Sequence, residues 1–241
     1  MIVNYTEGGW EIVTQRAHGL LAAQIAQQWK YSARTKRWTE LLMAIAEHDD
    51  AQIELERDNL LTPEGGPLDF KMKVFEQRHC TQTMDFALSK SRYIALLCSM
   101  HLDFVYGAEC LHHAQGRAFL QEQKKLQKRW QKELGMSLAE AQRDYRLLEW
   151  CDALSLLLCQ RENQPEARAV EISKGPDNRN HQLMQLTDQT LTVRPWSFES
   201  SGFEVSFETR LIPQLAFKNA GFRSAFLKAE VVEKRWTFKR D

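Results

Sequence analysis

Apolar residues recur at helical spacing through most of the first 160 residues, and side chains that can bind metals interrupt several of these stripes. The clearest case is the segment from 38 to 49, where the stripe continues onto His48 and Asp49. His18, His101 and Asp152 occupy equivalent inward positions in three other segments. A buried polar group without a partner costs roughly 2–7 kcal/mol. Because these residues all face one helical core, we expect them to share a partner, and a divalent metal ion is the simplest one.

The spacing of apolar and turn-forming residues predicts an α+β protein. Residues 1–14 are typical of a β-hairpin with a turn at Glu7-Gly8-Gly9, and residues 15–160 of an all-helical core. The composition changes near residue 165, and we expect residues 166–241 to form a small antiparallel β-sheet that the hairpin joins and that packs on the core. The expected helices cover residues 15–30, 38–49, 71–86, 91–106, 115–134 and 138–160. The expected strands of the tail cover residues 169–173, 183–186, 191–195, 203–209 and 231–238.

Helix-end signals support three of these boundaries. Thr14 can cap the helix that follows it, and Gly135 can end the long basic helix before it. The sequence Ser137-Leu138-Ala139-Glu140 is a capping box, which predicts a helix start at this point.

Composition excludes several classes of protein. Lys+Arg and Asp+Glu both total 32 among 241 residues, so net charge gives no signal for binding nucleic acid or an anionic membrane. The longest apolar run, 154–159, is far too short to span a bilayer, and no signal peptide is apparent at the N-terminus. The five cysteines include no CxxC pair and fall within helical patterns. They are typical of reduced core residues, which predicts a cytoplasmic protein.

The order of the metal-type residues resembles that of the HD-domain superfamily of metal-dependent phosphohydrolase-like proteins. His18 matches the first position, the run 41–49 that ends in His48-Asp49 matches the second, and Asp152 within 149–154 matches the last. The resemblance covers residues 15–160, and the layout of the tail, including 194–198, is similar to that of a bacterial family related to the HD proteins. The resemblance to the HD-domain superfamily implies that His18, His48, Asp49 and Asp152 are metal ligands. It also implies that Asp49 orients the attacking water.

Histidine nitrogen combined with carboxylate oxygen suits Fe, Mn, Co, Ni or Mg as the divalent metal. Such a site predicts a hydrolase in which metal-activated water attacks a small phosphorylated molecule or a nucleotide. His101 and His79 are further candidate ligands. No glycine-rich phosphate loop is present, so the phosphate needs a basic side chain near the metal. Candidates by closeness in sequence are Arg16, Arg78 and Arg92.

Two alternatives to the hydrolase remain open at this point. An HD-like di-iron oxygenase would use the same scaffold but would need about six protein ligands, recruiting His79 and His101. A non-catalytic metal-binding or regulatory protein would keep the site for structure and make its contacts through the β region. The metal content of the purified protein distinguishes the three classes. The hydrolase predicts one ion per chain, the oxygenase predicts two irons, and the non-catalytic protein predicts no metal.

Overall fold

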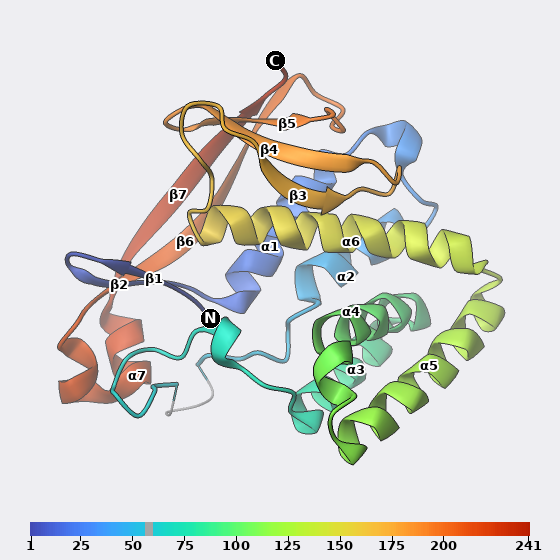
Figure 1. Ribbon diagram of the computed structural model, residues 1–241, viewed down its shortest axis with the longest axis horizontal. Helices are drawn as coiled ribbons and strands as arrows, with labels where there is room; N and C mark the ends of the chain where they lie inside the picture. Colours follow the sequence, from blue (N-terminus) through green and yellow to red (C-terminus); the bar gives the residue numbers. More distant parts are fainter. Residues whose placement is uncertain (56–59) are drawn as a thin grey trace.

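The structure, a computed structural model, describes residues 1–55 and 60–241 (Figure 1). Within these residues the chain forms seven α-helices, two short 3-10 helices and seven strands. The helices are α1 (Gln15–Gln27), η1 (Tyr31–Ala33), α2 (Trp38–Glu47), η2 (Phe70–Met72), α3 (Gln77–Lys90), α4 (Arg92–Cys110), α5 (Ala114–Leu134), α6 (Leu138–Cys159) and α7 (Ala216–Lys228). The strands are β1 (Ile2–Thr6), β2 (Gly9–Val13), β3 (Val170–Lys174), β4 (Asn180–Thr187), β5 (Thr190–Arg194), β6 (Gly202–Pro213) and β7 (Glu230–Lys239).

The sheet is larger than expected, and the prediction of an all-helical core with a small antiparallel sheet is wrong. All seven strands belong to one curled sheet in the order β1-β2-β6-β7-β5-β4-β3 (Figure 1). The sheet is mixed, because β5 and β7 pair in parallel through Thr190–Thr237 and Leu191–Phe238. The long strand β6 pairs with β7 over ten residue pairs and with β2 over four. The N-terminal hairpin and the tail are therefore joined by backbone pairing across about 200 residues of sequence.

The helix ends follow the local signals with one displacement. The side chain of Thr14 accepts a hydrogen bond from the backbone N–H of Ala17, and Ser137 and Glu140 form the predicted capping box. Gly135 ends α5 with φ +63, a left-handed conformation that favours glycine. The helix expected over 71–86 is instead displaced: η2 is followed by extended chain, and α3 begins at Gln77.

Helices and sheet share one hydrophobic core. Helix α1 lies against β6, where both arms of the Gln24 amide bond the backbone of Ser206 (2.8 and 3.0 Å). Helix α6 lies beside β3 (Figure 1). Between these layers Trp29, Trp150 and Phe198 pack edge to face at centroid distances of 4.9–6.0 Å. The connection between β5 and β6 therefore completes the burial of aromatic residues on α6 and just after α1.

A close approach of α1 to α2 sets the geometry of the candidate site. Gly19 lies against the backbone of α2, and a Cβ built at this position would be 2.4 Å from the carbonyl oxygen of Ala46. No side chain fits there without moving a helix. His18 immediately precedes Gly19, and His48 lies two residues after Ala46, so the contact brings the two imidazoles together.

Candidate metal centre

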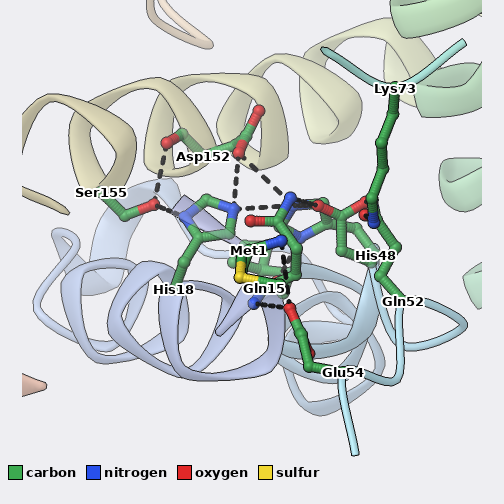
Figure 2. Close-up of polar contacts among 11 residues, drawn as sticks. Met1, Gln15, His18, His48, Gln52, Glu54, Lys73, Asp152 and Ser155 are labelled. Atoms are coloured by element: carbon green, nitrogen blue, oxygen red, sulfur yellow. Dashed lines mark hydrogen bonds and ion pairs between the residues drawn. The ribbon is translucent and has the colours of Figure 1, made fainter. Parts of the chain in front are cut away.

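Three buried side chains from three helices converge on one point. Nε2 of His18 lies 3.0 Å from Oδ1 of Asp152 and 3.2 Å from Nε2 of His48, and His48 Nε2 lies 3.4 Å from the same Asp152 oxygen (Figure 2). His18 is on α1, His48 caps the C-terminus of α2, and Asp152 is in the middle of α6. All three are at least nine-tenths buried. The sequence predicted these three residues as ligands, and the structure brings them together.

The hydrogen bonds around the two imidazoles fix which nitrogen atoms carry protons. Nδ1 of His48 lies 2.8 Å from the carbonyl oxygen of Ile45, which can only accept, so this nitrogen is the donor. Ser155 donates its hydroxyl proton to the carbonyl oxygen of Asp152, and its oxygen then accepts from Nδ1 of His18 at 2.7 Å. In the neutral imidazoles both Nε2 atoms therefore present lone pairs. Together with the carboxylate of Asp152, they form three acceptors that face one another without a donor.

Three converging acceptors require a positive charge between them. Atoms bound about 2.1 Å from one ion lie roughly 3.0–3.4 Å apart in octahedral or tetrahedral geometry. The observed separations of 3.0, 3.2 and 3.4 Å fall in this range. His18, His48 and Asp152 thus form a group that could hold a metal ion. Both the type of the three ligand atoms and their spacing fit a divalent cation.

Without a metal, a proton takes this place. Burial by itself lowers the pKa of His48, but the negative charge of Asp49 and the hydrogen bond to Asp152 outweigh it and raise the pKa to about 9. Burial works to raise the pKa of Asp152, whereas hydrogen bonds from His18 and His48 hold it well below its usual value. The metal-free site is therefore an imidazolium–carboxylate pair near neutral pH.

A second group overlaps the first. His48, Asp49 and His101 also offer ligand atoms within 4.8 Å of one another. The ring of His101, on α4, packs edge to face on that of His48 at a centroid distance of 4.7 Å. His101 is 3 % exposed, and its Nδ1 has no hydrogen-bond partner among the described residues. Burial, followed by the positive charge of His48, lowers the pKa of His101 to about 4, so this ring is neutral at pH 7.

Asp49 lies at the edge of the centre and is held by two amides. Gln15 donates to its Oδ2 at 2.9 Å, and Gln52 donates to its Oδ1 at 3.0 Å. Nζ of Lys73 in turn lies 2.5 Å from the carbonyl oxygen of Gln52 (Figure 2). Burial works to raise the pKa of Asp49, but the net shift is downward, and the positive charge of His48 is the largest effect that lowers it, so Asp49 is ionised at neutral pH.

A cavity of about 240 Å³ opens onto these residues. Its wall combines hydrogen-bond acceptors and imidazoles with two lysines and apolar side chains. It is lined by Gln15, His18, Asp49, Gln52, Phe70, Lys71, Lys73, His101, Val105, Tyr106, Glu109, Asp152 and Leu156.

Four predicted site residues lie elsewhere. His79 lines a separate pocket, with its Nδ1 3.3 Å from a carboxylate oxygen of Glu76. Arg16 pairs with Asp50 at 2.9 Å, and Arg92 pairs with Glu133 on α5 at 3.0 Å. Arg78 is exposed on α3, and none of the three arginines lines the cavity at the metal centre. The cationic side chains at this cavity are Lys71 and Lys73, which were not predicted as site residues.

Gln15, Gln52 and Ser155 were also missed. Polar residues at a helix start, in a loop or within one turn of a helix are common, so their type alone carries no signal. Ser155 had one available signal, because it lies three residues after Asp152 on α6 and faces inward with it.

The chain belongs to the family described as "Protein of unknown function (DUF3891)", whose family model matches residues 1–214. The matched range includes every residue of the candidate metal centre and of the cavity. No curated protein and no solved structure matches the chain. Among the helices of the described residues, none combines the length and apolar character that crossing a bilayer requires.

Proposed function

We propose that the protein is a metal-dependent phosphohydrolase of HD type that acts on a small phosphorylated compound. The observation that carries this proposal is the convergence of His18 Nε2, His48 Nε2 and Asp152 Oδ1 within 3.0–3.4 Å at the wall of a cavity that also carries lysines. A divalent cation held there would polarise a phosphoryl oxygen and make water a better nucleophile near neutral pH.

The side chains around the centre have separable roles. His18, His48 and Asp152 would hold the metal, with Ser155 and the Ile45 carbonyl orienting the two rings. Asp49 is ionised and held by two amides, which suits it to orient a water molecule. Lys71 and Lys73 supply positive charge for the phosphate in the same cavity.

The reaction follows from this arrangement. The water oxygen forms a bond to phosphorus while the ester P–O bond breaks, and the leaving oxygen takes the bonding electron pair. One water proton ends on the released alcohol, and the other stays on the phosphate. The cavity of about 240 Å³ is smaller than the roughly 300–1,000 Å³ typical of ligand pockets. This favours a compact phosphate ester, since the base of a nucleotide would have to lie outside.

The overlapping group of His48, Asp49 and His101 is the observation that favours a second candidate, a di-iron oxygenase. The separate location of His79 argues against the larger ligand set that such a centre needs. Two irons per chain in purified protein would favour the oxygenase, and one ion would favour the hydrolase. Protein without metal affinity would favour the non-catalytic role.

A substrate screen tests the proposed activity. Small phosphomonoesters, phosphodiesters and nucleotides are incubated with wild-type protein and Mn, Co, Ni, Fe or Mg. We expect metal-dependent phosphate release that His48→Ala reduces at least about 10³-fold. His112→Ala is the matched control, because His112 is exposed beyond α4 and outside the centre. Activity that survives in His48→Ala, or none with any metal and substrate, would reject the proposal.

A further inference from the structure

Gln15 is buried in the cavity wall with half of its amide unsatisfied. It is the first residue of α1 and is 2 % exposed. Because the Asp49 carboxylate can only accept, the Gln15 nitrogen must face it, and the amide orientation is therefore fixed. The carbonyl oxygen Oε1 then points away from Asp49 and has no donor among the described residues.

Gln52 provides an internal comparison. It donates to the other oxygen of Asp49, and its own carbonyl oxygen accepts from Lys73 at 2.5 Å. The two amides thus hold Asp49 in the same way but differ at their carbonyl ends. Leaving a buried acceptor unpaired is unfavourable, so the unpaired carbonyl of Gln15 indicates a place for an external hydrogen-bond donor.

The chemistry of the cavity identifies this donor. A phosphate oxygen without a proton would be repelled by Oε1 of Gln15 and by the Asp49 carboxylate. The cationic groups that can attract it are Lys71 and Lys73, which line the same cavity. A water molecule can donate one proton to Gln15 and the other to Asp49, which leaves a lone pair directed at phosphorus. We infer that Gln15 is a catalytic residue that binds the attacking water through Oε1. This inference rests on the proposed hydrolase.

A matched pair of variants tests the role in solution. Gln15→Met and Gln52→Met each remove one amide from Asp49 at nearly constant side-chain length, but only Gln15→Met removes an acceptor for water. We expect kcat to be about 10- to 100-fold lower in Gln15→Met than in Gln52→Met. KM and the dissociation constant for Mn²⁺, measured by calorimetry, should differ between the variants by less than about threefold. An equal loss of kcat would show that Gln15 only holds Asp49, and would overturn the inference.

A structural measurement decides the same question without activity. In crystals of wild-type protein soaked with Mn²⁺, we expect a water within about 3.2 Å of Gln15 Oε1 that also contacts Asp49. In Gln15→Met crystals this water should be absent. A protein donor on Oε1, or no water there, would overturn the inference. If wild-type protein hydrolyses no phosphate ester, the proposed function fails, whereas the crystals still report separately on water binding by Gln15.

Discussion

The Nε2 atoms of His18 and His48 lie 3.2 Å apart, and the other nitrogen of each ring is bonded so that both Nε2 atoms are acceptors in the neutral state. Two acceptors in contact repel each other, and Asp152 adds a negative charge at 3.0 and 3.4 Å. The fold imposes this unfavourable contact through the close packing of α1 on α2 at Gly19. A cation between the three side chains removes the repulsion, whether it is a proton or a metal ion.

Metal affinity should rise with pH up to about pH 9. The pKa of His48 is raised to about 9, so at pH 7.5 the metal-free protein carries a proton that metal binding must displace. His101, with its pKa lowered to about 4, is already neutral at this pH and releases none. Calorimetry of Mn²⁺ binding at pH 7.5, in two buffers with different ionisation enthalpies, should report about one proton released per ion. A heat that is the same in both buffers would contradict the pKa of His48.

Ser155→Ala should weaken metal binding by about 10- to 100-fold, because the serine fixes the ring of His18 that presents Nε2. Ser99→Ala is the matched control, since Ser99 is equally buried on α4 but bonds Gln123. Competition with a chelating dye measures both affinities. The same affinity in the two variants would show that the ring of His18 needs no support from Ser155.

Gly19→Ala should destabilise the protein by about 1–3 kcal/mol or more, because its Cβ would meet the Ala46 carbonyl oxygen at 2.4 Å. Separating α1 from α2 should also weaken metal binding. Gly107→Ala on α4 is the control, where the added Cβ makes an ordinary 3.5 Å contact. Since alanine favours a helix over glycine by up to about 1 kcal/mol, this control should be neutral or stabilising. Urea unfolding of both variants measures the difference, and equal stabilities would refute the close-packing account.

The residues of the candidate metal centre could be picked out from the sequence, because a polar residue on an apolar helical stripe is conspicuous. His18, His48 and Asp152 each interrupt such a stripe, and so does His101. Gln15 and Lys73 gave no comparable signal, since they lie at a helix start and in a loop, where polar side chains are ordinary. Gln15 contacts Asp49, which is 34 positions away in the sequence, and Lys73 contacts Gln52, which is 21 positions away. Their roles follow from these contacts.

The strand segments were also predictable, but their assembly was not. Alternating β-formers located each segment of the tail, whereas the pairing of β2 with β6 joins residues about 200 apart and leaves no local pattern. The parallel contact of β5 with β7 involves only two residue pairs. Helix α7 was not predicted because Gly221, with φ +68, interrupts it and breaks the helical period.

A fragment ending at Gln160 should lack a cooperative unfolding transition. It would lose β6, the partner of β2, and Phe198, which covers Trp29 and Trp150. Exposing this aromatic surface removes burial that the core depends on. Thermal unfolding followed by near-ultraviolet circular dichroism measures the effect against the full chain. A fragment with a sharp transition and full ellipticity would show that the helices fold without the sheet.

The metal content of the protein, after reconstitution with Mn²⁺ or Fe²⁺ and removal of excess ion, tests whether His18, His48 and Asp152 hold a metal. Elemental analysis should find about one ion per chain in wild-type protein and in His112→Ala, and less than about a tenth of that in His48→Ala and Asp152→Ala. Circular dichroism confirms that each variant is folded. Full occupancy in folded His48→Ala and Asp152→Ala would contradict a metal site built from these residues, as would wild-type protein that retains no ion.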